Sequence, residues 1–328
     1  MQGFSLQAIV RWFIANTVGL ILLSLAYVAG VFTAVLVQAA AERRQLVPKL
    51  EAIGLGAVTN FFDTLGIGSF APSTAWMKLR KMAPDSYFPA ILNAGHTLPT
   101  VTQALIFITL VQVDPMLLIA CIGAAVLGAW VGEPIVQRAP VKLVQTVVGV
   151  ALIIAALLFA LKNLDSGLPA MNFFGFTTPA VAPTHILPPG GGADALSLPT
   201  TLFIVAVIGH FVMGILMMFG IGLYAPSLIL LSILGLNPLA AFPIMMGSCA
   251  FLMPISSVRF VRSERIDLRI VIGMALGGIP AVLIAAFVVK NMDLVTLRWL
   301  VVVVVLYAAA LLLRSAFAAK PATANAAT

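Results

Sequence analysis

Two eight-residue segments of this chain combine glycine, proline and serine in nearly the same order. Residues 66–73 read GIGSFAPS and residues 220–227 read GIGLYAPS, with Phe against Tyr as one of the two mismatches. Proline suits the first turn of a helix, where its missing N–H is not needed, and the glycines before it permit a break or tight turn. Because helix N-termini carry partial positive charge and free N–H groups, each segment predicts an anion-binding helix start.

The candidate anion-binding residues are those of the two segments and of a polar helix face nearby. Asn93, His96 and Thr100 fall at i, i+3 and i+7, which is one face of a helix. The full set is Gly66, Gly68, Ser69, Ala71, Pro72, Ser73, Asn93, His96, Thr100, Gly220, Gly222, Ala225, Pro226, Ser227 and Ser248. The alternatives are that the segments only kink two ordinary helices and that the polar face binds neighbouring helices together.

The elements that must position these residues are transmembrane helices. The chain has 328 residues, of which 62% are hydrophobic and only 9% charged, too few charges for a soluble surface. Continuous apolar runs near 12–40, 143–161 and 294–313 reach the roughly 20 residues that a membrane-spanning helix needs. A β-barrel is disfavoured because its strands would alternate polar and apolar residues. The composition therefore predicts an all-α polytopic membrane protein.

The similarity between the two segments extends over most of the chain at a constant offset of 154 residues. It pairs Pro84 with Pro238, Pro89 with Pro243, and Gly123 with Gly277. Matched glycines and prolines are informative because each fixes a backbone feature. We expect an N-terminal helix and basic loop (1–45), a first copy (46–162), a Pro/Gly-rich external loop (163–199), a second copy (200–316) and a disordered tail (317–328).

Basic residues predict how each copy lies in the membrane, since positive loops face the cytoplasm. Placing 43–49, 78–86 and 258–268 inside leaves 163–199 outside. Each copy then holds a broken-helix or re-entrant hairpin followed by three transmembrane helices, and the two copies are inverted. Inverted repeats are typical of secondary transporters. The second limb of the first hairpin, from Pro72 to Met82, is too short to cross the bilayer, so its N-terminus is expected near the midplane.

Asp63 is the one acidic residue that we expect at the depth of the segments. Buried carboxylates in membranes are costly and often functional. Beside an anion the group must be protonated or bind a cation, so it is the candidate coupling residue for a proton or sodium. The alternative is a structural role in capping a helix or fixing the hairpin. The second copy has Met217 at the matching position, so either role belongs to one copy.

The duplicated segments, each followed by Phe-Pro and a helix with small and polar residues, resemble the TauE/SafE family of membrane transporters. The resemblance covers about 46–316 and implies export of sulfite, sulfoacetate or related organosulfonates across the cytoplasmic (inner) membrane. The extra N-terminal helix and the long central loop have no place in the family's motifs. An anion channel, or a transporter of another small anion, is the alternative.

An enzymatic function is disfavoured by the histidines and by the absence of nucleotide motifs. His96, His185 and His210 form no HExxH motif, and the sequence has no Walker loop. We therefore expect neither catalysis nor a cofactor nor a bound metal. A nucleic-acid partner is not expected either, because no basic patch with interleaved aromatics occurs. The identity of the anion, the coupling ion and the formation of a homodimer stay open.

Overall fold

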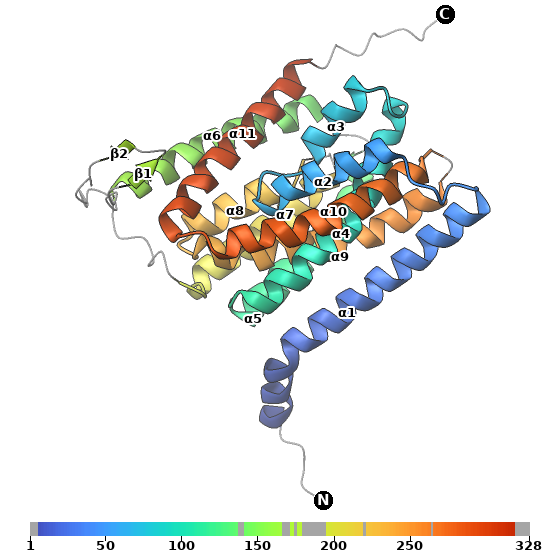
Figure 1. The fold of residues 1–328 in the computed structure, drawn as a ribbon. Coiled ribbons are helices and arrows are strands. Elements are labelled where there is room, and N and C mark those ends of the chain that lie inside the picture. Colours follow the sequence, from blue (N-terminus) through green and yellow to red (C-terminus); the bar gives the residue numbers. More distant parts are fainter. Residues whose placement is uncertain are drawn as a thin grey trace, which may run out of the picture.

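The computed structural model describes residues 6–136, 141–165, 171–173, 176–178, 195–218, 221–263 and 265–318. Within these ranges the chain is a bundle of α-helices (Figure 1). The elements are α1 (Leu6–Glu42), α2 (Leu50–Thr64), α3 (Phe70–Leu79), the 3-10 helix η1 (Asp85–Tyr87), α4 (Phe88–Leu110), α5 (Pro115–Val136), α6 (Val141–Asp165), β1 (Met171–Phe173), β2 (Phe176–Thr178), α7 (Thr200–Met218), α8 (Tyr224–Ile233), α9 (Pro238–Arg262), α10 (Leu268–Lys290) and α11 (Leu294–Ala318).

Six helices in the described ranges are long and apolar enough to cross a membrane, which confirms the predicted class of polytopic membrane protein. They are α1, α5, α7, α9, α10 and α11. Helix α4 has a comparable length of 23 residues. It is less apolar because it contains Asn93, His96 and Gln103, of which His96 and Gln103 are buried inside the bundle. The helix that the candidate polar face occupies is thus a central one.

Helix boundaries recur at the offset of the sequence repeat. Helices α3 and α8 begin at Phe70 and Tyr224 and end at Leu79 and Ile233, which is 224 − 70 = 154 and 233 − 79 = 154 residues apart. Packing partners are exchanged in the same way. Helix α2 packs against α10 and its counterpart α7 packs against α5, while α4 packs with α9 and α6 packs with α11. A pseudo-two-fold axis relates elements in this manner, although the inversion in a membrane stays a prediction.

The exchanged pairs α2–α10 and α5–α7 pack through glycine. A Cβ atom added at Gly277 of α10 would collide with the carbonyl oxygen of Ile53 in α2, and one added at Gly214 of α7 would collide with that of Ala125 in α5. Small residues let membrane helices approach this closely without a side chain between them. Substitution at either glycine would therefore separate two helices of the scaffold that carries the repeated segments.

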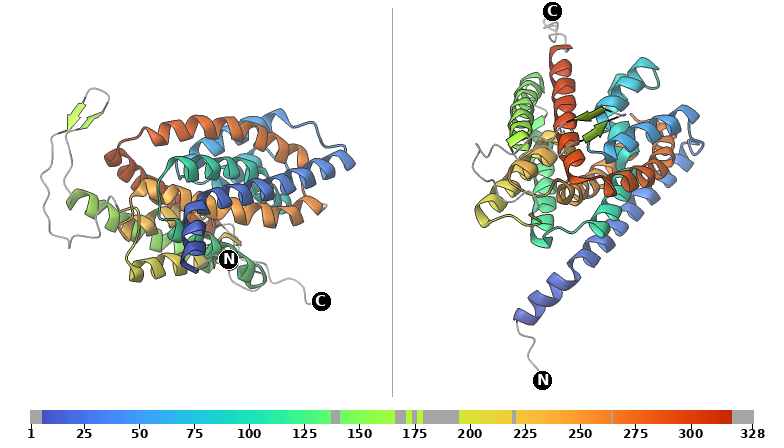
Figure 2. Two further views of the ribbon diagram at one scale, coloured as in Figure 1. Left: turned by 90° about the horizontal axis from the view of Figure 1, so that it is seen from below. Right: turned by 60° about the vertical axis from the view of Figure 1, so that its left-hand side comes forward.

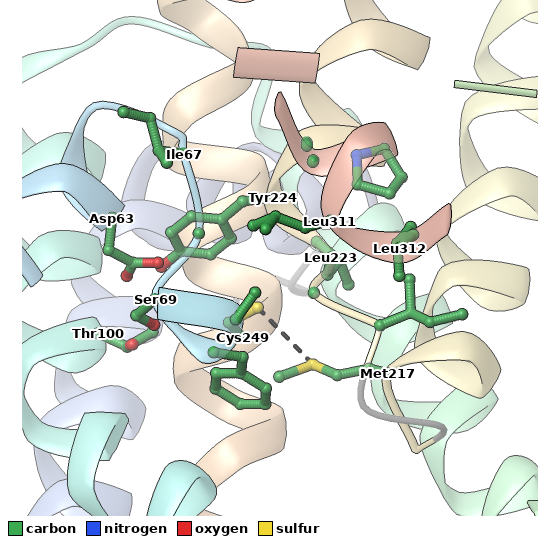
Figure 3. Close-up of a pocket in the computed structure, with 18 of the residues that line it drawn as sticks. Asp63, Ile67, Ser69, Thr100, Met217, Leu223, Tyr224, Cys249, Leu311 and Leu312 are labelled. Carbon is green, nitrogen blue, oxygen red and sulfur yellow. Dashed lines mark hydrogen bonds between the residues drawn. The ribbon is translucent and has the colours of Figure 1, made fainter. Parts of the chain in front are cut away.

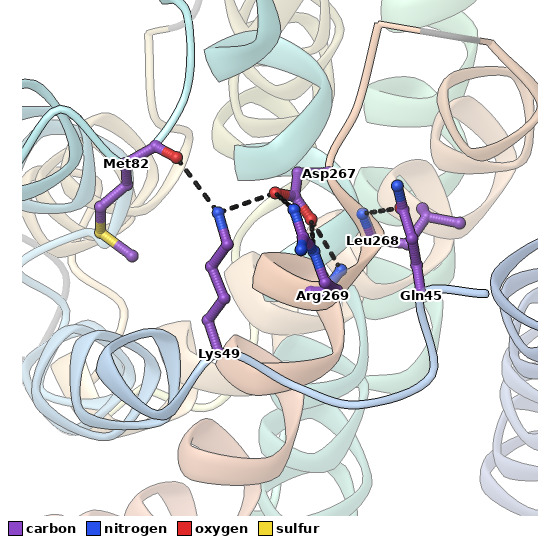
Figure 4. A network of polar contacts seen from close by, with 6 residues as sticks. All are labelled: Gln45, Lys49, Met82, Asp267, Leu268 and Arg269. Atoms are coloured by element: carbon purple, nitrogen blue, oxygen red, sulfur yellow. Dashed lines mark hydrogen bonds and ion pairs between the residues drawn. The ribbon is translucent and has the colours of Figure 1, made fainter. Parts of the chain in front are cut away.

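The N-terminal helix α1 lies outside the repeat. It packs mainly against α9 and α4, and its N-terminal end projects from the bundle (Figures 1 and 2). After α1 the chain enters a loop that meets two other loops through polar contacts (Figure 4). Lys49 forms an ion pair with Asp267 at 2.8 Å and donates to the carbonyl of Met82 at 3.4 Å. Gln45 accepts a hydrogen bond from the Leu268 N–H at 3.0 Å.

These contacts join the three loops that are predicted to be cytoplasmic. Arg43 adds to them by donating to the carbonyls of Val261 and Ser263 at 3.0 and 2.9 Å. The side chain of Asp267 also caps α10 by accepting from the Arg269 N–H. The loops 43–49, 78–86 and 258–268 thus share one end of the bundle, as the predicted topology requires. Which side of a membrane this end faces stays a prediction.

The segment 163–199 departs from the irregular loop that the sequence suggested, as far as it is described. Helix α6 continues to Asp165, and β1 pairs with β2 as an antiparallel hairpin. Paired Phe and Thr residues explain the hairpin, because both types favour strands. The register pairs are Met171 with Thr178, Asn172 with Thr177 and Phe173 with Phe176, so each pair includes a Phe or a Thr. Helix α11 runs to Ala318, so it extends two residues into the predicted tail of 317–328. Residues 319–328 lie outside the described residues.

Candidate functional site

The two repeated segments line one cavity of about 90 Å³ (Figure 3). Residues 67–71 approach it from the first copy and residues 221–226 from the second. Six helices provide the remaining wall, each with one to three residues: Asp63 of α2, Thr100 of α4, Leu152 of α6, Met217 of α7, Cys249 and Met253 of α9, and Ala308, Leu311 and Leu312 of α11. The cavity therefore lies where both copies meet.

The size of the cavity limits its occupant. One water needs about 10–15 Å³ of such volume, so a cavity of about 90 Å³ accommodates only a few groups of that size. Pockets for drug-sized ligands run to about 300–1,000 Å³. A small ion such as an oxyanion matches this space, whereas a nucleotide does not.

The helices α3 and α8 both start at the cavity, and neither start is capped by a side chain. The N-cap residues are Ser69 and Leu223, and no side-chain hydrogen bond caps either helix. The leading N–H groups of an α-helix have no partner within the helix. Pro72 and Pro226 stand at the third helical position, so the first turn ends at a residue without an N–H. Two helix N-termini without a side-chain cap thus face one small space.

The backbone before α3 adopts a conformation that only glycine takes easily. Gly66 and Gly68 have φ angles of 92° and 86°. These values lie in the left-handed region, where a Cβ atom is disfavoured. The two glycines turn the chain from the end of α2 into the start of α3, and so deliver residues 67–71 to the cavity.

The candidate residues from the sequence divide into two groups by their positions. Those that line the cavity are Asp63, Gly68, Ser69, Ala71, Thr100, Gly222, Ala225 and Pro226. Those that do not line it are Gly66, Pro72, Ser73, Asn93, His96, Ser227 and Ser248. Gly220 lies outside the described residues. Both repeated segments thus line the cavity, but Thr100 is the one residue of the polar face of α4 that does so.

Two members of that polar group satisfy their own helix backbone. The Asn93 side chain donates to the carbonyl of Pro89 at 2.9 Å, and the Ser248 hydroxyl donates to that of Ile244 at 2.8 Å. Side chains that bond four residues back in this way are common in helices and need no ligand. Close by, Thr97 reaches Ser257 of α9 at 3.1 Å. Of these contacts only that between Thr97 and Ser257 joins two helices, and neither Asn93 nor Ser248 lines the cavity.

Ser73 and His96 form a buried pair. The Ser73 Oγ lies 2.9 Å from His96 Nε2, and His96 Nδ1 lies 2.9 Å from Asn60 Oδ1. Because the Asn60 amide donates to the carbonyl of Gly56 at 2.7 Å, its Oδ1 is the atom that accepts from the His96 N–H. His96 Nε2 then carries the lone pair. Ser73 therefore donates its hydroxyl proton to His96 and does not direct it into the cavity.

The second segment repeats this pair with a histidine from a different helix. Ser227 Oγ lies 2.9 Å from His210 Nε2, and His210 Nδ1 lies 2.8 Å from the carbonyl of Ala206. A carbonyl only accepts, so Ser227 is again the donor. His210 comes from α7, whereas His96 comes from α4. No partner for His210 could be predicted from the sequence, because its position matches Gly56 in the first copy.

A second polar chain crosses between the copies beside the cavity. Gln103 of α4 donates to Asp63 Oδ2 and to Thr64 Oγ1, each at 3.0 Å. Its carbonyl oxygen accepts from the hydroxyl of Tyr224, the first residue of α8. Figure 3 shows the Asp63 carboxylate beside Tyr224 and Ser69. Asp63 is only 3% exposed, and among the described residues no ion pair includes it.

Residues that the candidate set omits complete the cavity. Tyr224 had a signal in the sequence, since it is the Tyr that replaces Phe70 of the first segment. Three sulfur-bearing side chains also line the wall: Met217, Cys249 and Met253. Cys249 Sγ lies 3.9 Å from Met217 Sδ. These residues look like ordinary apolar positions in the sequence, so nothing there distinguishes them.

Comparison with known proteins supports the resemblance for the second half of the chain. A family model described as sulfite exporter TauE/SafE matches residues 202–328, a range that includes the second repeated segment. No curated protein and no solved structure is detectably similar to the chain. The match covers 127 of the 328 residues, so it supports the resemblance for the second copy alone. The apolar helices indicate a multi-pass membrane protein, and the matched family is described as one of sulfite exporters.

Proposed function

We propose that the protein is a secondary transporter that exports a small sulfur-containing oxyanion, such as sulfite, sulfoacetate or a related organosulfonate. The anion binds in the cavity between the N-termini of α3 and α8. The observation that carries this proposal is that the two repeated segments, far apart in sequence, start two helices at the same small cavity. The family match supports the choice of sulfur anions.

The donors of the cavity suit a delocalised anion. Helix N-termini bind anions through backbone N–H groups and the helix dipole. The hydroxyls of Ser69 and Thr100 lie on the same wall but bond to Asp63 and Tyr224, so the backbone N–H groups of the helix starts are the donors proposed for the anion. Neither Arg nor Lys lines the cavity among the described residues. This fits a transport site, because a buried cation would be costly in a membrane and would hold the anion too tightly to release.

The remaining wall is apolar and rich in sulfur. It includes Met217, Cys249 and Met253 together with Leu223 and Leu312. Thioethers are soft and polarisable, and they adapt to irregular shapes. Such a wall suits the sulfur centre or the short carbon chain of an organosulfonate, while its oxygens take the N–H donors.

Asp63 is the residue that we assign to coupling. Its carboxylate lines the same cavity as the proposed anion, and its hydrogen-bond partner Gln103 is neutral. Two like charges 4 Å apart repel by about 4 kcal/mol at an effective dielectric of 20. That repulsion would weaken the affinity for the anion roughly a thousandfold while Asp63 is ionised. The anion therefore binds when Asp63 carries a proton, so that proton and anion cross in the same direction. Export is then driven by the outward gradient of the anion, because an inward proton gradient opposes it; sodium is the other cation that would neutralise the carboxylate.

Binding and flux measurements test this function. Purified protein is screened by thermal shift against sulfite, sulfoacetate, taurine, sulfate and chloride, and the stabilising anions are then followed in proteoliposomes. We expect stabilisation by sulfite or an organosulfonate, and saturable flux that a proton gradient drives. Stabilisation by chloride alone would contradict the assigned substrate class. Unsaturable flux at ion-channel rates would identify a channel instead of a transporter.

We place the protein in the cytoplasmic membrane with its basic loops inside. Single cysteines at Ser263 and Ser166 test this orientation by labelling from outside. The α9–α10 loop around Ser263 shares one end of the bundle with the other two basic loops. Residue 166 lies outside the described residues. We expect labelling at 166 and protection at 263; the reverse pattern would overturn the inverted topology.

A further inference from the structure

The two half-helices α3 and α8 are covered very differently. Helix α8 packs against α6 and α11 as well as α7 and α9, whereas the main neighbours of α3 are α2 and α4. Eight of the ten residues of α8 are buried, but in α3 only Ser73 and Met77 are. The pair α6–α11 therefore closes the cavity on the α8 side and leaves the α3 side uncovered.

The covering pair is itself symmetric under the repeat. Helices α6 and α11 are counterparts at the 154-residue offset, and they pack against each other. Their contact is buried on both sides, through Ala156 and Phe159 of α6 and Val305 and Ala309 of α11. Because the repeat exchanges α6 with α11, the pair has two equivalent surfaces, one suited to α8 and one suited to α3. The structure uses one of these surfaces.

The unused surface can be identified residue by residue. Ala308, Leu311 and Leu312 of α11 line the cavity beside the start of α8 (Figure 3). Subtracting 154 gives Ile154, Leu157 and Leu158 of α6. These side chains are 54%, 53% and 55% exposed. Two of the three are identical to their α11 counterparts, and all three are apolar.

We propose that Ile154, Leu157 and Leu158 form the cavity wall against α3 in the opposite-facing state of the transporter. In that state the α6–α11 pair has rotated from α8 to α3. The covered and uncovered half-helices then exchange roles, as the halves of inverted-repeat transporters do. This inference rests on the proposed transport function, and it assigns new residues to the transport site.

The backbone on both sides of α3 permits its change of surroundings. Gly66 and Gly68 precede the helix with positive φ angles, and Lys81 follows it with a φ of 49°. The far end of α3 is held to α2 by Glu51, which pairs with Arg80 at 2.6 Å and accepts from the Trp76 indole at 3.2 Å. These polar contacts leave the apolar side of α3, including Leu79 at 83% exposed, without a covering helix.

The alternative is that the exposed face of α6 contacts lipid in every state. Reversible cross-linking with a short, reducible bis-methanethiosulfonate distinguishes the two. The test pair is Ala71→Cys with Leu157→Cys, which join only if α6 reaches α3. The matched control pair is Ala225→Cys with Leu311→Cys, whose native residues line the same cavity in this structure. The native cysteines are buried, and single-cysteine variants measure their background reaction.

We expect both pairs to cross-link in proteoliposomes and both cross-links to be released on reduction. A minor state populated at about 0.1–10% still accumulates, because the cross-link traps it. Intact mass spectrometry counts the bridged molecules. A second test pair, Ala75→Cys with Leu158→Cys, serves if the first variant fails to give monodisperse protein.

Monodisperse variants in which only the 225–311 pair cross-links would overturn the inference. The proposed substrate can fail separately. If both pairs cross-link but neither sulfite nor an organosulfonate stabilises the protein, the exchange of walls stands and the assigned substrate falls.

Discussion

The repeated segments give the same local structure but different surroundings. In each copy the helix starts at the fifth residue of the segment, and the serine at its end donates to a buried histidine. At the helix start the copies differ at two positions, Ser69 against Leu223 and Phe70 against Tyr224. Phe70 stacks on His96, with ring centroids 5.9 Å apart, whereas Tyr224 hydrogen-bonds to Gln103. Local sequence thus determines the helix start, while single substitutions give each copy its own role.

The two copies also differ in the groups that they bring to the cavity. The first copy provides the only carboxylate of the described cavity wall, at the position where the second copy has Met217. The second copy provides the more deeply buried half-helix. We infer that α3 and Asp63 respond to the proton and to movement, whereas α8 forms the fixed half of the anion site.

The largest expected effect comes from removing the carboxylate. Asp63→Asn keeps the hydrogen-bond geometry towards Gln103 but cannot release a proton. We expect anion binding that no longer depends on pH, together with loss of flux driven by a pH gradient in proteoliposomes. The reciprocal variant Met217→Asp should not restore coupling, because its side chain enters from α7 without Gln103 as a partner. Unchanged gradient-driven flux in Asp63→Asn would reduce Asp63 to a structural residue.

The next effect concerns the hydroxyl of Tyr224, whose counterpart in the first copy is Phe70. Tyr224→Phe makes the second segment resemble the first, and it leaves the buried oxygen of Gln103 without its donor. An unsatisfied buried polar group costs about 1–3 kcal/mol, so the unfolding temperature should fall. Phe70→Tyr is the matched control in the first copy. If Tyr224→Phe is as stable as the native protein, the contact between the copies contributes little.

A smaller effect is expected from the serine–histidine pairs. Ser73→Ala and Ser227→Ala each remove one neutral hydrogen bond, worth about 1 kcal/mol. Because both hydroxyls point at histidines and away from the cavity, the affinity for the anion should change little while thermal stability falls in both variants. A large loss of affinity with unchanged stability, measured by calorimetric titration and thermal melting, would return these serines to the anion site.

The smallest effect concerns the polar loops next to α3. Burial alone would raise the pKa of Asp267, but hydrogen bonds and positive charge from Arg269 and Lys49 outweigh it and lower the pKa. A lowered pKa in the folded state stabilises the fold above the unfolded value of about 3.9, and this stabilisation is lost as the pH falls through the folded value.

The expected result is a greater loss of stability below about pH 4 in the native protein than in Asp267→Asn. Hydrogen exchange then locates the change. Amides of α3 should exchange faster than those of α8 at every pH, since α8 is buried by apolar contacts. Acid should increase the exchange in α3 more than in α8. Equal protection of the two half-helices would contradict the asymmetry described above.

Much of the fold followed from the sequence. Apolar runs bounded by proline, glycine and charged loops predicted the helices, and the matched segments predicted where α3 and α8 begin. The single acidic residue near the segments also proved to line the cavity. These features depend on neighbours within a few residues, so a sequence alone displays them.

Other features depend on contacts between distant helices. The bonds from Ser227 to His210 and from Tyr224 to Gln103 join helices whose packing no local pattern reveals. The repeat itself predicts equal surroundings for α3 and α8, so their unequal burial could not be foreseen. The sulfur-lined wall was hidden for the same reason, because Met217 and Cys249 read as ordinary apolar positions.

The central claim is that the anion lies between the two helix starts, and Gly222 allows the most direct test. A Cβ atom at Gly222 meets nothing within 4 Å, although the residue lines the cavity. At Gly68 the positive φ would add backbone strain, so a valine there is less informative. Gly123 of α5 has equally open surroundings away from the cavity and provides the control.

The measurement is the affinity for sulfite and sulfoacetate, by calorimetric titration, of the native protein, Gly222→Val and Gly123→Val. We predict that Gly222→Val loses binding while it remains monodisperse and melts near the native temperature, and that Gly123→Val binds as the native protein does. Native affinity in Gly222→Val would contradict the account. The anion site would then have to be sought elsewhere, along the Asn93–Thr100 face of α4.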